Sequence, residues 1–180
     1  MGDELRGENL VHLNVRFSTE TELKRIQDFL YEKSGQGVSF TGLVEAMANE
    51  VTIVTAAHNI KSNKGSKTAG VDKIKMDKYL QMPKDELILL IQSCFRNYRP
   101  KPARREYIEK SNGKKRPLGI PTVLDRIIQE CVRIIIEPIC EARFYPQSYG
   151  FRPYRAQKHA IRGIINVINA GCKSPHHPAW

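Results

Sequence analysis

The residues with the clearest chemistry lie between Arg96 and Arg116, a segment with nine basic and two acidic residues. Arginine binds phosphates through a planar fork of donors, and lysine binds them as a point charge. Lys110 and Arg116 flank Asn112-Gly113, a strong hairpin-turn signal, so they would lie on neighbouring strands and can clamp a polyphosphate. A second interpretation is an exposed edge hairpin whose charges prevent aggregation. The alternation of residues alone does not decide between them.

The charge of the whole chain is unevenly distributed. Residues 1–60 hold five basic and nine acidic residues, whereas residues 61–180 hold 24 basic and ten acidic ones. No acidic residue follows Glu141, while six basic residues do. This one-sided pattern favours a polyanionic partner, which means nucleic acid, over a basic surface that serves solubility alone.

Several other classes of protein and site are disfavoured. The four cysteines are 37, 9 and 32 residues apart, without the close pairs of a zinc site, and His176-His177 fits a mobile tail better than a metal site. Gly65-Ser66-Lys67-Thr68 resembles only the end of a phosphate-binding loop, because the required glycine spacing is absent. No stretch is long and apolar enough to cross a membrane, and the acidic start resembles no signal peptide. We expect a cytoplasmic protein with reduced thiols.

Hydrophobic periodicity predicts mostly helix. Thr19-x-x-Glu22 forms a capping box for a helix over 20–32, a second helix is predicted over 41–62, and a basic, glycine-containing loop follows over 63–70. Pro83 is expected in the first turn of a third helix that ends before Arg99-Pro100.

The second half of the chain contains the hairpin and two more helices. Strands are predicted over 104–110 and 114–120, and Thr122-x-x-Asp125 begins a long helix that is apolar nearly all round at 134–136, as in a buried central helix. Pro138 is expected to bend or end it. A last helix is predicted over 155–169. The fold class is therefore α+β, mostly α-helical with an antiparallel β-hairpin.

Several sequence blocks resemble the group II intron-encoded reverse transcriptases, or maturases. They comprise Lys115–Pro121, which reads KRPLGIP, then Asp125-Arg126-x-x-Gln129, Glu137-Pro138-x-x-Glu141-x-x-Phe144, and Ser148–Arg155, which begins SYGFRP. Asn63–Asp72 is similar to the block that precedes them. The resemblance covers about residues 20–172, and the RPLGIP and SYGFRP blocks are highly specific.

The resemblance implies part of a right-hand polymerase that copies RNA into DNA and assists intron splicing and mobility. The expected organisation is an N-terminal extension at 1–50, fingers at 51–145, and a fingers–palm junction at 146–180. The expected partners are group II intron RNA, a template–primer duplex and a deoxynucleoside triphosphate, with no membrane.

The resemblance also assigns roles to residues. Lys110 and Arg116 match the positions that hold the triphosphate of the incoming nucleotide. The strand that lies near the templating base matches Pro117, Leu118, Gly119, Ile120 and Pro121. From the charge pattern and the resemblance together, the residues expected to contact RNA are Lys64, Lys67, Arg99, Lys101, Arg104, Arg105, Lys114, Lys115, Arg152 and Arg155.

The chain departs from a complete polymerase in its carboxylates. Polymerisation requires paired carboxylates that hold two Mg²⁺ ions, but no Asp follows Asp125 and no Asp-Asp pair exists. We therefore expect no catalytic residue and no metal site here, and Mg²⁺ only in a longer parent enzyme that continues past Trp180. The alternatives are a non-catalytic RNA-binding module and a related reverse transcriptase used in defence. Which RNA is bound, and whether the chain forms a homodimer, stay open.

Overall fold

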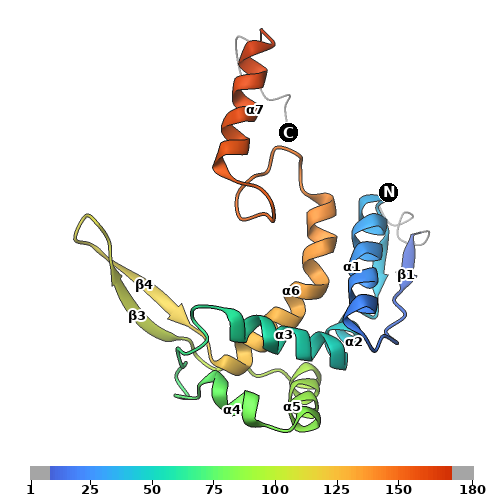
Figure 1. The fold of residues 1–180 in the computed structure, drawn as a ribbon, viewed down its shortest axis with the longest axis vertical. Helices are drawn as coiled ribbons and strands as arrows, with labels where there is room; N and C mark the ends of the chain where they lie inside the picture. Colours follow the sequence, from blue (N-terminus) through green and yellow to red (C-terminus); the bar gives the residue numbers. More distant parts are fainter. Residues whose placement is uncertain (1–8, 172–180) are drawn as a thin grey trace, which may run out of the picture.

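Helix α6 (Val123–Arg143) runs through the middle of the molecule, and α1 and α3 pack along it (Figure 1). The computed structural model describes residues 9–171. The Thr122 hydroxyl caps α6: it accepts a hydrogen bond from the Asp125 amide at 3.1 Å and donates one to the Asp125 carboxylate at 2.6 Å. This confirms the predicted start of the helix. Its buried positions recur at helical spacing, as expected for a central helix.

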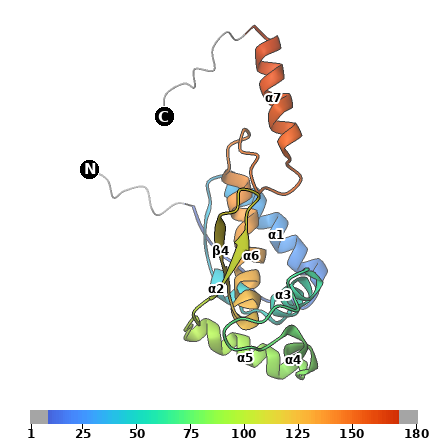
Figure 2. The ribbon, with the colours of Figure 1, turned by 90° about the vertical axis from the view of Figure 1, so that its left-hand side faces the viewer.

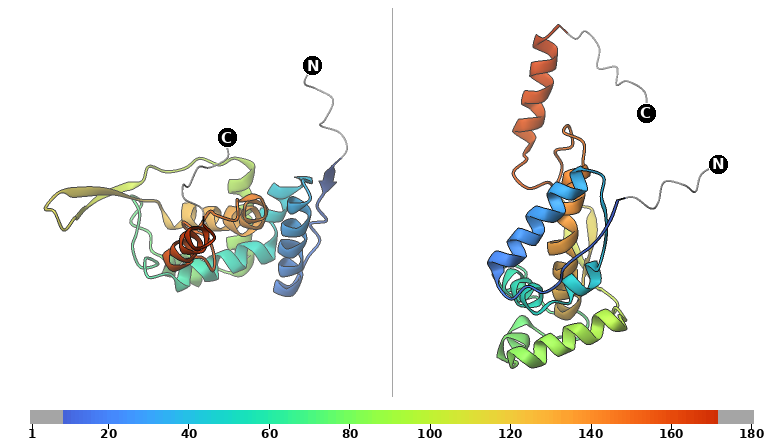
Figure 3. Two further views of the ribbon diagram at one scale, coloured as in Figure 1. Left: turned by 90° about the horizontal axis from the view of Figure 1, so that it is seen from above. Right: turned by 90° about the vertical axis from the view of Figure 1, so that its right-hand side faces the viewer.

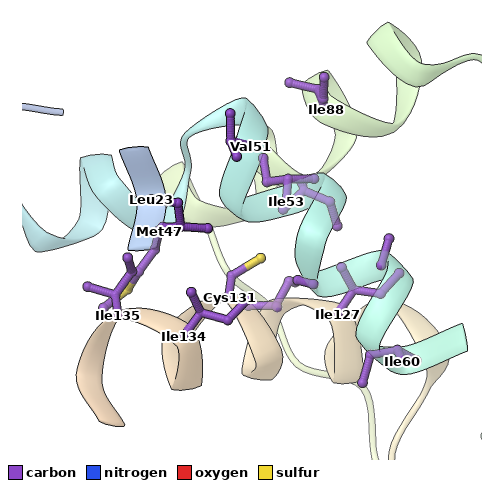
Figure 4. Close-up of a cluster of buried hydrophobic side chains, with 14 of the residues drawn as sticks. Leu23, Met47, Val51, Ile53, Ile60, Ile88, Ile127, Cys131, Ile134 and Ile135 are labelled. Carbon is purple, nitrogen blue, oxygen red and sulfur yellow. The ribbon is translucent and has the colours of Figure 1, made fainter. Parts of the chain in front are cut away.

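The hydrophobic core fills the space between α6, α1 (Glu20–Gly35) and α3 (Glu50–Ser62). Figure 4 shows the side chains that meet there: from α6 Ile127, Cys131, Ile134 and Ile135, and from the facing elements Leu23, Met47, Val51, Ile53, Ile60 and Ile88. Burying one such aliphatic side chain contributes about 1.5–3 kcal/mol. Burial also raises the pKa of the Cys131 thiol to about 12, which makes this cysteine unreactive.

Proline 138 lies inside α6 and does not end it, because the helix continues to Arg143. Proline has no N–H, so the carbonyl of Ile134 lacks its usual partner within the helix. The side-chain amide of Gln27 on α1 donates to that carbonyl at 3.0 Å. Two turns further along α1, the Ser34 hydroxyl donates to the carbonyl of Ile139 at 2.9 Å. The interruption in α6 therefore gives α1 a polar attachment point.

The single helix predicted over 41–62 is wrong, because the structure divides it into α2 (Leu43–Met47) and α3. Asn49 makes the division. Its side chain accepts from the Val51 amide at 2.8 Å and so caps α3, and its NH₂ group donates to the carbonyls of Val15 and Phe17 at 3.0 and 3.1 Å. Asn49 thus stabilises the break and holds the incoming chain at once.

The N-terminal part matches its prediction for α1 and adds a small sheet that was not predicted. The capping box of Thr19 and Glu22 is present, which confirms the start of α1. Strand β1 (Leu10–His12) pairs in parallel with β2 (Ser39–Thr41). Three-residue strands from distant parts of the chain leave no periodic signal in the sequence.

Two further helices lie against the start of α6, α4 (Met76–Gln81) and α5 (Lys84–Arg96), as Figure 2 shows. The sequence predicted α5 but not α4, whose six residues are too few for a periodic pattern. Pro83 precedes α5 as its N-cap instead of lying in its first turn. Leu87, Ile88 and Ile91 bury the apolar face of α5 in the common core.

The hairpin and the last helix extend away from this body. Strands β3 (Arg104–Glu109) and β4 (Lys115–Ile120) form an antiparallel arm that projects clear of the helices (Figure 3). Helix α7 (Gln157–Asn169) lies beyond the opposite end of α6. The architecture confirms a mostly helical α+β fold with a β-hairpin.

The base of the arm is attached to the body at two points. The Tyr98 hydroxyl donates to the buried carboxylate of Asp125 at 2.9 Å. The Lys101 ammonium lies 3.5 Å from the Asp72 carboxylate, which is itself largely buried. Burial, and then the hydrogen bond to Asp125, raise the pKa of Tyr98 from 10.0 to about 12.

We expect Gln27→Leu to lower the free energy of unfolding by about 1–3 kcal/mol, because it leaves the Ile134 carbonyl without a partner. In a Pro138→Ala background the new amide at position 138 can bond Ile134, so the same substitution should cost less. Urea unfolding of the four chains measures both effects. Gln36→Leu, which removes only exposed contacts, is the control. An equal loss in both backgrounds would contradict this account.

Tyr98 should make the protein sensitive to alkali. Because its pKa is higher in the folded state than in the unfolded state, its neutral form stabilises the fold below pH 10 and this contribution disappears as the pH rises towards 12. We expect the stability difference between the wild type and Tyr98→Phe to shrink over this interval, measured by urea unfolding. Tyr107→Phe, on the exposed arm, should track the wild type. A difference independent of pH would argue against the hydrogen bond.

Candidate nucleic-acid interface

The tip of the arm is a tight turn built on Gly113. The amide of Gly113 donates to the carbonyl of Lys110 at 2.9 Å, and the amide of Lys110 donates to the carbonyl of Lys114 at 2.8 Å. Gly113 has φ of +72°, in the left-handed region that favours glycine. The Asn112 side chain accepts from the Lys114 amide at 3.1 Å and closes the turn. The predicted hairpin is therefore confirmed, with a three-residue loop.

The strand register decides which side chains share a face. Arg116 lies opposite Ile108, while Lys110 lies opposite Lys114. Because side chains alternate along a strand, Lys110, Lys114 and Arg116 project from the same face. Lys110 and Arg116 are diagonal neighbours, about 7–8 Å apart on a typical ladder, and not direct partners. They can still reach one ligand together.

The carboxylates of the arm leave these cations free. Glu109 lies opposite Lys115, on the other face, and Glu106 pairs with Arg104 at 2.7 Å. Within residues 9–171, neither Lys110 nor Arg116 forms an ion pair, and both are exposed. The arm therefore presents cations whose donors are available to a ligand.

Apolar side chains lie among these charges. Tyr107 is 58% exposed on one face, and Ile108 is 46% exposed on the other. Among the residues predicted near the template, Pro117, Leu118 and Gly119 are exposed, whereas Ile120 and Pro121 are partly buried where β4 meets α6. The arm thus offers both charge and apolar surface, the combination that a nucleic-acid backbone with unpaired bases requires.

The remaining cations predicted on and near the arm fall into two groups. Arg99, Arg105 and Lys115 are exposed and form no ion pair within the described part of the chain, so they are available to RNA. Lys101 and Arg104 instead pair with Asp72 and Glu106 and brace the arm.

The basic loop over 63–70 lies against the start of α6. Its Lys64 and Lys67 are exposed, as an RNA contact requires. Arg126 holds the loop by donating to the carbonyls of Gly65 at 2.8 Å and Thr68 at 2.5 Å. Gly70 allows the close approach, because a Cβ there would lie 2.7 Å from the Thr122 Cα. This role of Arg126 was not predicted from the sequence.

The loop between α6 and α7, residues 144–156, is built around two arginines. Arg152 is 7% exposed, pairs with Glu141 at 2.9 Å, and donates to the carbonyls of Tyr145, Ser148 and Glu141. Arg155 bonds the carbonyl of Pro146 and lies 5.5 Å from the centre of the Tyr149 ring. These contacts give both arginines a structural role. Their contact with RNA stays a prediction, and for Arg152 it would require bonds of the loop to open.

Two aromatic residues of this loop have an unusual backbone. Phe151 and Tyr154 have φ of +57° and +58°, a region that non-glycine residues enter at a cost of about 1–3 kcal/mol each. Both side chains are fully exposed. Nothing in the composition of the block predicted this arrangement, since aromatic residues usually lie in the core.

Neither a group of metal ligands nor a membrane-spanning helix is found among the described residues. Within residues 9–171, no three His, Cys, Asp or Glu side chains are grouped so that they could hold a metal ion. In the same part of the chain, no helix combines the length and apolar character needed to cross a bilayer.

Comparison with known proteins places the chain in a family. No family model matches it. It is 44% identical over 119 residues to protein YkfC of Escherichia coli, which covers 62% of this chain and 30% of that protein. It is 42% identical over 127 residues to group II intron-encoded protein LtrA of Lactococcus lactis, with 69% of this chain and 21% of that protein covered.

A plant protein extends the comparison. Nuclear intron maturase 1 of Arabidopsis thaliana is 32% identical over 117 residues, with 65% of this chain and 14% of that protein covered. The chain thus spans less than a third of the length of these curated relatives. The resemblance found in the sequence is confirmed: the chain belongs with the group II intron-encoded proteins and intron maturases, and it matches one part of their length.

Proposed function

We propose that these residues form the part of an RNA-directed DNA polymerase that grips RNA and the incoming nucleotide. In this proposal the longer protein copies RNA into DNA and assists the splicing and mobility of a group II intron. The observation that carries the proposal is the projecting arm, which presents Lys110, Lys114 and Arg116 on one face without a neighbouring carboxylate partner. A relationship to intron-encoded proteins supports RNA as the polyanion.

The two faces of the arm suit two different ligands. A triphosphate concentrates negative charge that grows on the leaving group during transfer, so it fits the face with three clustered cations. The opposite face carries two cations and an aromatic ring, Arg105, Tyr107 and Lys115, together with one acidic residue, Glu109. That combination fits an extended strand of RNA, whose phosphates and bases alternate.

In this proposal, the metal ions that polymerisation requires are held by residues outside this chain. Two Mg²⁺ ions held by carboxylates would activate the attacking hydroxyl and stabilise the leaving pyrophosphate. The sequence has no Asp after Asp125 and no Asp-Asp pair. We place the catalytic carboxylates in a part of the longer protein outside these 180 residues.

A non-catalytic RNA-binding module is the second candidate, and the same lack of paired carboxylates favours it. The polymerase and the RNA-binding module predict different residues in the reading frame after Trp180. An Asp soon after that point and a later Asp-Asp pair support the polymerase, and their absence supports the module.

We expect the 180-residue chain to bind RNA in a salt-dependent way. If about six phosphates are neutralised, a plot of log K against log salt should have a slope of roughly −4 to −5. Replacing Arg99, Arg105 and Lys115 with glutamine should make the slope shallower by about 2, measured by fluorescence anisotropy. Replacing Lys24, Lys33 and Lys84, which pair with carboxylates elsewhere, should leave it unchanged. If the two triple variants changed the salt slope equally, the RNA site would not be on the arm.

Arg116 should determine nucleotide affinity in the longer enzyme. Arg116→Lys retains the charge but loses the fork of donors, so the nucleotide KM should rise several-fold, and Arg116→Ala should raise it further. Affinity for the template should change little. Lys115→Ala, on the opposite face, is the matched control. If Arg116→Ala instead lowered the melting temperature and left KM unchanged, the residue would have a structural role only.

A further inference from the structure

The loop between α6 and α7 exposes two aromatic rings that no contact within the described residues explains. Phe151 is 111% exposed and Tyr154 is 100% exposed, which is more than any other large apolar side chain in residues 9–171. The loop lies beside the lower end of α7 (Figure 2). Both residues also have a left-handed backbone. Strained backbone persists where the surrounding structure enforces it, and such positions concentrate at binding sites.

The surrounding structure does enforce it here. Arg152 follows Phe151 directly and points inward, where its guanidinium bonds Glu141 and three carbonyls and lies 5.1 Å from the centre of the Phe144 ring. Arg155 follows Tyr154 in the same way, with its bond to the Pro146 carbonyl. In each pair an anchored arginine is preceded by an exposed ring. The bonds of Arg152 and Arg155 therefore hold the loop so that the rings of Phe151 and Tyr154 point towards solvent.

The charge around the rings identifies the class of ligand. The sequence contains no acidic residue after Glu141, and Glu141 itself is neutralised by Arg152. Lys158 and Arg162, in the first two turns of α7, are exposed and form no ion pair within the described part of the chain. Exposed rings that are followed closely in the chain by free cations suit unpaired nucleic-acid bases, which stack on aromatic faces while cations contact the phosphates.

We propose that Phe151 and Tyr154 form a stacking site for unpaired bases of RNA. The proposal rests on the proposed function, since it requires that the chain binds RNA. It differs from the expectation that Arg152 and Arg155 contact phosphates: the arginines build the loop, and the rings make the contact. The isoleucines exposed on α7 do not belong to this site, because aliphatic side chains provide no aromatic face for stacking.

Glycine substitutions separate binding from folding. Glycine adopts positive φ without strain, so Phe151→Gly and Tyr154→Gly should keep or raise the melting temperature of the 180-residue chain. Each should weaken the binding of a single-stranded RNA oligonucleotide about tenfold, because one stacked base is lost. The slope against salt should stay as in the wild type, because the phosphate contacts remain. Binding of a fully paired RNA duplex should be unaffected.

Two further variants test the aromatic contact. Phe151→Leu keeps an apolar side chain and the backbone strain, so a tenfold loss would identify the ring itself as the contact. Tyr31→Leu, on an exposed ring of α1 in the acidic half, is the control and should bind as the wild type does.

The outcomes distinguish this proposal from the function it rests on. If the wild type binds RNA with the expected salt slope but the glycine variants bind equally well, the stacking site is wrong and the proposed function stands. If those variants keep their RNA affinity but change the sedimentation of the chain, the rings contact protein, which also overturns the site. If the wild type binds no RNA, both proposals fail.

Discussion

The buried carboxylate of Asp125 is the interaction on which the arrangement of the site depends. It lies in the first turn of α6, where it accepts hydrogen bonds from Thr122 and Tyr98. Thr122 begins the helix, and Tyr98 lies just before the arm. The next residue, Arg126, holds the basic loop, and the residue after it, Ile127, enters the core. One turn of helix therefore joins the hydrophobic core, the loop and the arm.

The basic residues of this chain perform two separate tasks. Arg126 and Arg143 bond carbonyl groups of distant segments, and Arg152 bonds carbonyl groups of its own loop. All three hold loops whose backbone groups would otherwise lack partners. Lys110 and Arg116 on the arm bond no side chain of the described residues and stay available to ligands. The count of 29 basic residues therefore overstates the number of cations that are free to bind a ligand, because some of them are engaged inside the fold.

Local signals in the sequence predicted most of this architecture. The capping residues Thr19 and Thr122 and the Asn112-Gly113 turn act within a few residues of their own position, so their effect can be predicted from sequence. The points that the sequence predicted wrongly or left open involve long-range partners. Asn49 interrupts a helix because the carbonyls of Val15 and Phe17 are near, and α6 continues past Pro138 with help from Gln27. The exposure of Phe151 could not be predicted from the sequence either, because it depends on the inward position of the Arg152 side chain.

The length of the arm has a mechanical consequence. Six residues per strand give about 20 Å from base to tip. For a rod of that length, a tilt of about 5° at the base displaces the tip by about 2 Å, more than hydrogen bonds to a bound phosphate tolerate. The stiffness of the attachment at Tyr98 and Lys101 therefore determines how precisely the tip of the arm is positioned. A ligand that contacts both the arm and the body would limit the tilt of the arm. Residues that never touch the ligand thus set how well the arm can hold it.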